Sequence, residues 1–194
     1  MTEARPLRAD ARRNRDKVLA TAVHAFATEG ADVSLEAIAK AAGVGIGTLY
    51  RHFPTRDALV AAAYQNELDR IVGAVPELLA GLRPEAALRA WMDLFVGYMH
   101  AKRDLGDALR ALIASGGDPF AQSRERLIGA VVELMAAGVA AGTIRDDVPP
   151  LDVLVGLGGI TASADPAQAS RLLDLLMDGL RHGTSRPAGP PGGS

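Results

Sequence analysis

The fold is decided by one stretch, SLEAIAKAAGVGIGTLYRHFPTRDAL, which runs from Ser34 to Leu59. Its first half carries apolar residues at helical spacing, and serine at its start is a residue type that caps helices by accepting a backbone N–H. Gly43 interrupts the pattern, because glycine readily takes the left-handed conformation that ends a helix. A second, shorter helix is expected over residues 46–53, and Pro54 prevents its continuation. Two short helices joined at a glycine turn predict a helix-turn-helix.

The short second helix has a one-sided pattern of apolar and polar positions. At about 100° per residue, Ile46, Leu49 and Phe53 lie on one edge, which is expected to face the core. The opposite face offers groups suited to phosphate oxygens and base edges, and glycine leaves part of it bare, so that another molecule can approach the backbone. From this pattern Gly47, Thr48, Tyr50, Arg51, His52 and Arg56 are expected to contact DNA.

A basic segment precedes this stretch. Residues 5–17 contain six basic and two acidic residues, although the whole chain has a formal net charge of −2. A local concentration of positive charge favours contact with a polyanion, and a solvated charged tail is the alternative. The arginines of this segment that are expected to contact DNA phosphates are Arg12, Arg13 and Arg15.

The segment from Lys17 to Tyr64, and GTLYRHF at residues 47–53 most specifically, resembles the helix-turn-helix of the TetR family of transcriptional regulators. Members of that family are usually homodimers that bind palindromic operators and release them when a small ligand occupies the larger domain. The chain departs from the family pattern at Gly45, where a serine or similar residue often caps the recognition helix. Sequence readout is therefore expected to depend on Arg51, on Ile46 against thymine methyl groups, and on DNA shape. The resemblance implies DNA-backbone contacts by Thr48, Tyr50, His52 and Arg56, and a place near base edges for Ile46 and Gly47. Through it, Ser34, Gly45 and Ile46 join the set of positions that are expected to contact DNA.

Helical periodicity continues through most of the chain and predicts an all-α fold, with no alternating strand pattern and no internal repeat. Within the larger helical part, the helix that Thr55 caps is expected to continue to about Leu82, with Pro76 either kinking it or ending it early. The expected organisation is a basic flexible arm over residues 1–11, a three-helix helix-turn-helix DNA-binding domain over 12–58, a larger helical ligand-binding and dimerisation domain over 59–183, and a disordered tail over 184–194.

One helix of the larger domain carries an aromatic stripe. Trp91, Phe95 and Tyr98 recur at helical spacing, and such a face either forms ordinary core or lines a cavity for a small molecule. The resemblance favours the cavity. The residues expected to line it are Trp91, Met92, Phe95, Tyr98, Met99, Arg110, Phe120 and Gln122, with His100 as a further polar candidate.

The last two helices suit an interface between subunits. Leucines cover more of the final helix than one core contact needs, and three glycines interrupt the helix before it. Each glycine inside a helix costs about 1 kcal/mol relative to alanine, so the presence of three glycines needs a reason. Close packing of helices at a dimer interface is one explanation, and a frayed helix is the other. Pairing about a two-fold axis predicts a four-helix bundle that sets two recognition helices about 34 Å apart. The residues expected at this interface are Leu154, Leu157, Gly158, Leu172, Leu173, Leu176 and Leu180.

Other classes of function have little support in the sequence. The chain has no cysteine, which excludes disulfides and thiolate metal sites, and no cofactor or metal is expected. Its four histidines are scattered, and no nucleophile, phosphate-loop or zinc-protease motif occurs, so an enzyme is not expected. A helix-turn-helix protein that takes no ligand and binds other proteins is the remaining alternative.

The expected environment follows from the lack of a signal peptide and of a long apolar run. Both predict a cytoplasmic protein with no membrane contact. The expected partners are double-stranded operator DNA, a second copy of the chain, and a small-molecule effector whose identity the sequence does not reveal.

Overall fold

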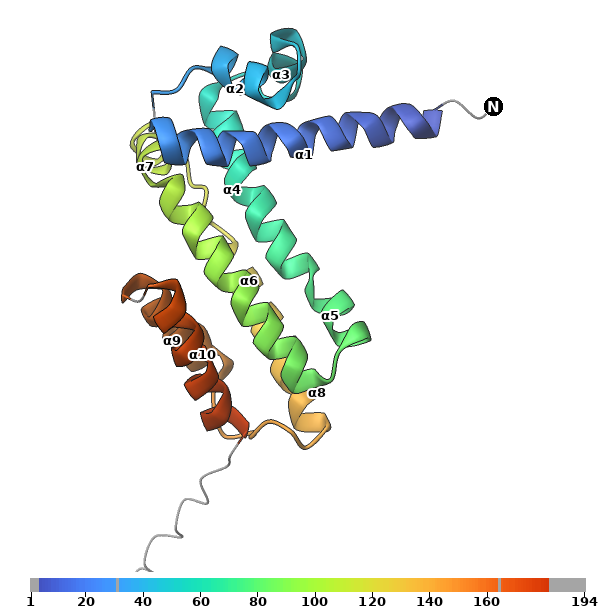
Figure 1. The fold of residues 1–194 in the computed structure, drawn as a ribbon, viewed down its shortest axis with the longest axis vertical. Helices are drawn as coiled ribbons and strands as arrows, with labels where there is room; N and C mark the ends of the chain where they lie inside the picture. The colour runs from blue at the N-terminus through green and yellow to red at the C-terminus, as the bar shows by residue number, and fades with distance from the viewer. Residues whose placement is uncertain (1–3, 31, 164, 182–194) are drawn as a thin grey trace, which may run out of the picture. The chain divides into compact units, whose positions relative to one another are not determined.

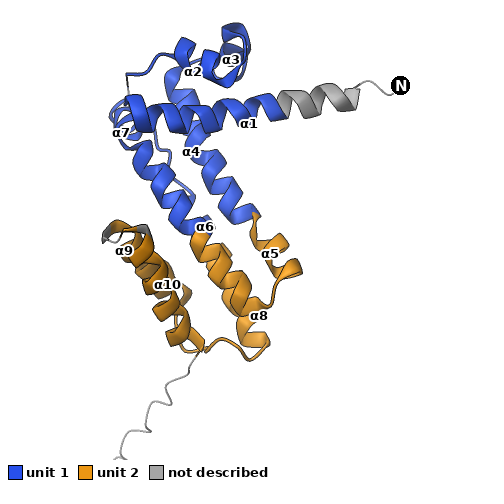
Figure 2. Cartoon of the chain, in the orientation of Figure 1, with its two compact units in different colours: residues 1–73, 94–126 blue, residues 74–93, 127–194 orange. Residues whose placement is uncertain are grey.

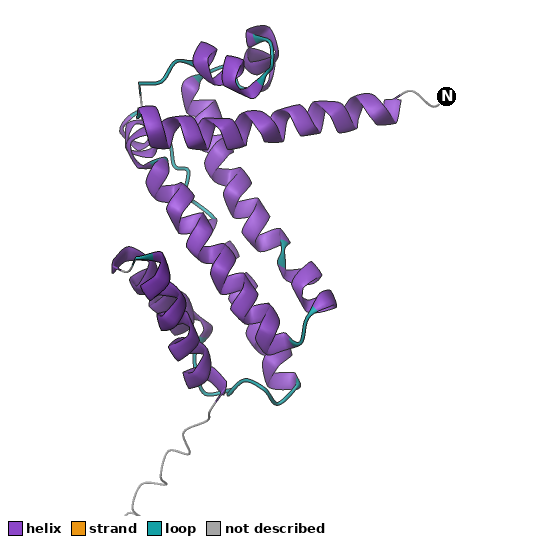
Figure 3. Cartoon of the chain, viewed as in Figure 1, coloured by secondary structure: helices purple, strands orange, loops and turns teal. Residues whose placement is uncertain are grey.

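The computed structural model describes residues 4–30, 32–163 and 165–181, and for residues 4–12, Ser163 and Pro166 it describes the backbone alone. All regular structure in these ranges is helical (Figure 3), which confirms the all-α prediction. No helix in these ranges is long and apolar enough to cross a membrane. The predicted tail at 184–194 lies outside the described residues.

The described helices follow one another with short connections (Figure 1). Their bounds are α1 (Ala4–Glu29), α2 (Leu35–Ala42), α3 (Ile46–His52), α4 (Arg56–Gly73), α5 (Val75–Gly81), α6 (Pro84–Asp104), α7 (Gly106–Ala114), α8 (Ser123–Ala140), α9 (Pro150–Ser163) and α10 (Pro166–Arg181).

The chain forms two compact units (Figure 2). Unit 1 comprises residues 1–73 and 94–126, and therefore holds α1 to α4, the second half of α6, α7 and the start of α8. Unit 2 comprises residues 74–93 and 127–194, and holds α5, the first half of α6, most of α8, and α9 and α10.

The first helix differs from the expectation of a flexible arm. α1 begins at Ala4, so residues 4–11 continue the helix rather than precede it. These residues include alanine, leucine and arginine, which favour helices, and Pro6 falls in the first turn, where its missing N–H costs no hydrogen bond.

The helix-turn-helix is held by the predicted caps. Gly30 (φ 81°) and Gly43 (φ 66°) take the left-handed conformation, and the N–H of Gly43 donates to the carbonyls of Ala39 and Lys40. The Oγ of Ser34 accepts the N–H of Ala37 at 3.0 Å. α2 packs against α1 and α3, and the apolar residues of this core are Ile38, Ala42, Leu49 and Phe53.

The helix that follows α3 ends before Pro76 and well short of its expected end near Leu82. α4 stops at Gly73, and α5 starts at Val75 with Pro76 in its first turn. A proline there lacks an N–H that has no partner within the helix in any case, so Pro76 starts a helix more readily than it continues one. The alternative in which proline ends the long helix is therefore confirmed.

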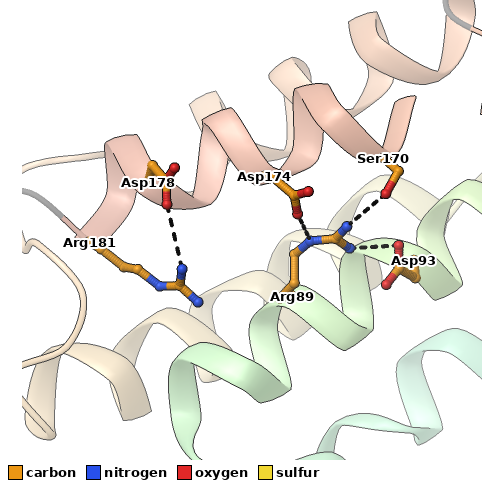
Figure 4. A network of polar contacts seen from close by, with 6 residues as sticks. All are labelled: Arg89, Asp93, Ser170, Asp174, Asp178 and Arg181. Carbon is orange, nitrogen blue, oxygen red and sulfur yellow. Dashed lines mark hydrogen bonds and ion pairs between the residues drawn. The ribbon is translucent and has the colours of Figure 1, made fainter. Parts of the chain in front are cut away.

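In unit 2, an arginine of α6 joins that helix to α10 (Figure 4). Arg89 Nε lies 2.8 Å from Asp174 Oδ1, and its Nη1 lies 2.6 Å from Asp93 Oδ1. Arg89 Nη2 also lies 3.4 Å from Ser170 Oγ. The Arg89 side chain is 19% exposed, so these contacts pair a guanidinium that has lost much of its water with two carboxylates. Two polar residues of the last helix, Ser170 and Asp174, thus serve packing within the chain.

Glu85 provides a pH-dependent contribution to stability. It is buried in the first turn of α6, and its Oε1 lies 2.7 Å from Arg83 Nη2. A hydrogen bond to its own backbone lowers the pKa of Glu85 below 4.5 against the opposing effect of burial, and Arg83, Thr143 and Arg181 lower it further. A carboxyl whose pKa is depressed by folding stabilises the protein above its unfolded pKa, and this stabilisation is lost as the pH falls through the folded pKa.

We therefore expect Glu85→Gln to lower the Tm at about pH 7, and the difference from the unsubstituted chain to shrink below about pH 4. Thermal unfolding followed by circular dichroism across this range measures the effect. Glu133→Gln, an exposed carboxylate on α8, is the control. An equal Tm difference at both ends of the range contradicts the assignment.

Gly138 allows the connection after α8 to fold tightly back on that helix. Its carbonyl accepts the N–H of Thr143 at 2.9 Å and of Ile144 at 3.2 Å. A Cβ at position 138 would lie 2.4 Å from Ile144 Cγ1 and 2.9 Å from Ile144 Cβ, and Ile144 is buried. Gly138→Ala is therefore expected to cost about 1–3 kcal/mol of unfolding free energy, measured by denaturant titration.

Gly129→Ala, on the same helix but facing open space, is the matched control for Gly138→Ala. It is expected to be neutral or to stabilise by up to about 1 kcal/mol. Combining Gly138→Ala with Ile144→Ala should restore part of the loss, because the nearest atom is removed. If Gly138→Ala costs the same unfolding free energy in the Ile144→Ala background as in the unsubstituted chain, a clash between residues 138 and 144 is contradicted.

Candidate nucleic-acid interface and effector site

α3 is anchored by its apolar edge. Leu49 is fully buried and Phe53 is 3% exposed, as predicted from their spacing. Gly45 is the N-cap, and it supplies no side-chain hydrogen bond, so the first turn is closed by backbone alone, with the Gly45 carbonyl accepting the N–H of Thr48 at 2.8 Å. The helix is thus held from one side and leaves its other side to solvent.

The outward face of α3 combines exposed side chains with a bare patch. Ile46 is 38% exposed, although its spacing had predicted the core-facing edge, and Tyr50 is 43% exposed. A Cβ at Gly47 would find no atom within 4 Å, so the backbone there is open to a close approach. Arg51 and His52 are exposed and Thr48 is half-buried.

Arg51 folds back along this face. Its Nη2 donates to Thr48 Oγ1 at 2.9 Å, and its Nε donates to the Gly47 carbonyl at 3.3 Å. The guanidinium therefore lies next to the position that has no side chain. The positive charge of Arg51 is thus held on the face of α3 that is predicted to contact DNA, and the hydroxyl of Thr48 orients it.

In the structure Arg56 is engaged within the chain, and its predicted phosphate contact stays a prediction. Its Nη2 donates to the Val33 carbonyl, and its guanidinium carbon lies 5.8 Å from the centroid of the Phe26 ring. The side chain thus joins the start of α4 to α1 and to the connection before α2.

The remaining predicted DNA residues are distributed along α1 and α2. Arg13 is exposed, whereas Arg15 is half-buried with its guanidinium carbon 5.8 Å from the centroid of the Phe53 ring. The side chain of Arg12 lies outside the described residues. Ser34 is used as the cap of α2 and remains exposed.

Part of the predicted effector site is a buried aromatic cluster in unit 1. The ring of Tyr64 lies 6.0 Å from that of Tyr98 and meets Phe120 edge-on at 5.0 Å, while Phe95 lies 5.9 Å from Tyr98. Tyr64 and Ser123 were missed by sequence reasoning, because tertiary packing alone brings them to this cluster. Phe95, Tyr98 and Phe120 were predicted.

A chain of hydroxyl groups runs through this cluster. Tyr64 Oη donates to Ser123 Oγ at 2.9 Å, and Tyr98 Oη lies 2.5 Å from Tyr64 Oη. Each hydroxyl has one proton, so Tyr98 must donate to Tyr64. Burial raises the pKa of Tyr98, and its bond to Tyr64 adds to the rise, so the phenol stays neutral.

The other residues predicted to line the pocket differ in their burial and in the unit to which they belong. Trp91 and Met92 are fully buried and belong to unit 2. In unit 1, Arg110 and Gln122 are exposed and Arg110 bonds Asp107, so neither polar group is directed into the aromatic cluster. The half-buried side chains are Met99 and His100.

Lys102 lies at the border of the same cluster. Its ammonium is 4.5 Å from the centroid of the Phe120 ring, and partial burial lowers its pKa. Among the described residues, hollows also occur away from this cluster. One of about 400 Å³ in unit 2 is mostly apolar and includes Val132, Met135 and Val139, and one of about 460 Å³ in unit 1 is polar and lies between α1 and α4.

The predicted subunit-interface residues divide into two groups. Leu157, Leu173 and Leu180 are buried within the single chain, at 0%, 0% and 2% exposure, because they fill the core of unit 2. Val155, which was not predicted, is 63% exposed, and Leu175, one of the leucines that cover the final helix, is 67% exposed. The half-exposed members of the prediction are Leu154, Gly158, Leu172 and Leu176.

Comparison with known proteins matches both parts of the chain. Residues 18–63 match the family model of bacterial regulatory proteins of the TetR family, and residues 83–182 match the model of the C-terminal domain of SbtR-like transcriptional regulators. An HTH-type transcriptional regulator of Staphylococcus aureus (strain USA300) is 41% identical over 64 residues. That match covers 32% of this chain and only 35% of the relative's length.

Solved structures resemble the chain over most of its length. The crystal structure of a TetR transcriptional regulator from Streptomyces coelicolor is 54% identical with a TM-score of 0.81, and the match covers 86% of this chain and 98% of that chain. A TetR transcription regulatory protein from Mycobacterium vanbaalenii is 38% identical with a TM-score of 0.75, over 91% of this chain and 100% of that chain.

Proposed function

Because this chain belongs to the TetR family of transcriptional regulators, we propose that it is a repressor that binds a palindromic operator as a homodimer and releases it when a small molecule binds. The observation that carries the DNA-binding part is the outward face of α3, with Tyr50, Arg51 and His52 exposed beside the open backbone of Gly47. These groups suit the major groove of a duplex and its phosphates.

The proposed division of labour on α3 follows from side-chain chemistry. Tyr50 and His52 bind phosphate oxygens, and Thr48 shares its hydroxyl between Arg51 and the DNA backbone. Arg51 reaches a guanine edge or a phosphate, and Ile46 contacts thymine methyl groups. Since Gly45 and Gly47 add no side chain, DNA shape contributes the rest of the specificity.

Dimerisation through α9 and α10 is the second part of the proposal. Val155 and Leu175 are large apolar side chains that remain exposed in the single chain, which a partner subunit would cover. The half-exposed leucines beside them, Leu154, Leu172 and Leu176, extend the same candidate surface. A two-fold bundle of these helices would place two recognition helices about 34 Å apart, in successive turns of the major groove.

Release by a small molecule is the third part. The buried aromatic cluster of unit 1 includes Tyr64 of α4, and α4 follows the recognition helix directly. An effector that binds better when α4 is displaced would shift the population away from the DNA-binding state. The affinity for operator falls by the same factor by which DNA weakens effector binding.

Selection of bound sequences from a random pool of DNA duplexes tests the proposal. The expected result is an inverted repeat whose half-sites are about one helical turn apart, bound by a dimer. Analytical ultracentrifugation of the complex measures its stoichiometry. Enrichment of no sequence rules out operator binding, and enrichment of a single half-site by a monomer rules out the dimer.

The basic N-terminal segment is expected to make operator affinity depend steeply on salt. Each neutralised phosphate contributes about −0.9 to the slope of log K against log salt concentration, because counterions are released. Deleting residues 1–11, which contain Arg5 and Arg8, should reduce the magnitude of that slope by about 1–2. Fluorescence anisotropy at several salt concentrations measures it, and an unchanged slope refutes the role of this segment.

A further inference from the structure

One segment of unit 1 makes side-chain contacts with α4 at several positions along that helix. This segment, residues 115–126, comprises the α7–α8 connection and the start of α8, and we call it the clasp. Asp57, in the first turn of α4, meets Ser115 at the start of the clasp, and Asp69, further along α4, meets Arg126 at its end, so the two run in the same overall direction. Tyr64 and Gln65 make the contacts between these ends. The contacts on α4 extend from position 57 to position 69, which is about 18 Å of helix.

The two outer contacts of the clasp are polar and exposed. Ser115 Oγ lies 2.9 Å from Asp57 Oδ2, and Arg126 Nη2 lies 2.7 Å from Asp69 Oδ1. Solvent screens such contacts, so each contributes little by itself. These two contacts show which residues of α4 lie opposite the two ends of the clasp.

The two inner contacts are more sheltered. Gln65 Nε2 donates to the Pro119 carbonyl at 2.8 Å from a half-buried position. Tyr64 Oη donates to Ser123 Oγ at 2.9 Å, with Tyr64 1% and Ser123 6% exposed. Because the single proton of Tyr64 goes to Ser123, removing the serine hydroxyl leaves a buried donor without its acceptor, which is more costly than the loss of an exposed bond.

The clasp is built to hold one conformation. Gly116 has φ 94°, which a side chain would strain, and a Cβ at Gly117 would lie 2.6 Å from Leu112 Cδ1. Asp118 Oδ1 accepts the N–H of Phe120 at 3.1 Å, which closes a local turn. Because these restraints keep the clasp in one conformation, its contacts can hold α4 in one position.

We propose that the clasp sets the position of α4, and through α4 that of the helix-turn-helix, with Ser123 and Gln65 as positioning residues for operator binding. α4 packs against α1, which in turn packs against α2, so a shift of α4 carries the recognition helix with it. The inference rests on the proposed function, because its consequence is a defined distance between the two half-sites. Loosening the clasp therefore broadens the range of spacings that the dimer accepts.

The experiment uses the half-site that the unsubstituted chain selects, placed as an inverted repeat with spacers of every length from zero to several base pairs. The unsubstituted chain should enrich one spacer. Ser123→Ala and Gln65→Ala should each enrich neighbouring spacers as well, and lower the affinity for the preferred operator by about five-fold or more. Ser123→Thr, which keeps the hydroxyl, should restore the original preference.

Thr161→Val is the matched control, because the Thr161 hydroxyl is also buried but bonds carbonyls of its own helix α9 in unit 2. It should lower thermal stability without changing the preferred spacer. The half-site sequence should stay the same in all variants, since α3 is unaltered. General destabilisation would reduce the active fraction and leave the spacer preference as it is.

Folded Ser123→Ala and Gln65→Ala variants that keep both the spacer preference and the affinity overturn the proposal. If Ser123→Ala does not fold, the result for Gln65→Ala decides alone. If the unsubstituted chain selects no DNA sequence, the proposed function fails and the clasp proposal fails with it. A selected operator with unchanged spacing in the variants removes the clasp proposal only.

Discussion

Trp91→Ala is expected to lower the free energy of unfolding by about 3–5 kcal/mol, the largest stability effect of any substitution considered for this chain. Trp91 has no exposed surface, and it shares one face of α6 with buried Leu88 and Phe95, three residues before and four residues after it. Truncation removes the transfer free energy of the indole and leaves a cavity that rigid helices fill only in part.

Denaturant unfolding followed by far-ultraviolet circular dichroism measures the Trp91 effect, because the substitution removes the chain's only tryptophan fluorophore. Trp91→Phe should lower the free energy of unfolding clearly less than Trp91→Ala does, since an aromatic ring still fills much of the space. Ile113→Ala, at a side chain that is 46% exposed, should change the free energy by no more than about 0.5 kcal/mol. A loss below about 1 kcal/mol for Trp91→Ala means that the site relaxes or admits water, and it contradicts a closely packed core.

The second large effect concerns DNA. Replacing Tyr50 and His52 together by alanine should weaken operator binding about 100-fold, because a hydrogen bond to a charged phosphate contributes about 1.5 kcal/mol or more and two are lost. Both side chains are exposed, so the free energy of unfolding should change by no more than about 0.5 kcal/mol for each substitution. The loss should be similar for all operator sequences, since phosphates carry no sequence information.

Anisotropy titration of the selected operator and of point variants of it measures this loss. His24→Ala, at an exposed histidine of α1, is the matched control and should bind like the unsubstituted chain. Arg51→Ala should behave differently from the double variant and alter the ranking of the operator variants. A folded double variant with unchanged affinity shows that α3 does not contact DNA through this face.

The sequence by itself determined the local structure of the helix-turn-helix. Ser34 caps α2, and Gly43 ends that helix in the left-handed conformation, both as predicted. Spacing also placed Leu49 in the core and Arg51 outside it. These features depend on interactions within a few residues, such as a cap, a positive φ or a helical period, and a linear sequence contains that information directly.

Spacing predicted which side chains lie on the same face of a helix, but not whether that face is buried against other helices or exposed to solvent. Leu157, Leu173 and Leu180 carry the same chemistry as Leu175, yet they are buried while Leu175 is 67% exposed. The same holds for Ile46, which the pattern assigned to the core edge of α3 and which is 38% exposed. Position on a helix gives an angle, whereas burial depends on the neighbouring helices.

Only the tertiary structure decided the partners that are distant in the chain. Arg56 binds the carbonyl of Val33, and Tyr64 binds Ser123, which lies 59 residues further along the chain. No periodicity encodes such pairs, because they arise when packing brings separate helices together and the buried polar groups must then satisfy one another. The sequence therefore determined where this protein presents its recognition helix, and the tertiary structure decided which side chains hold that helix in position.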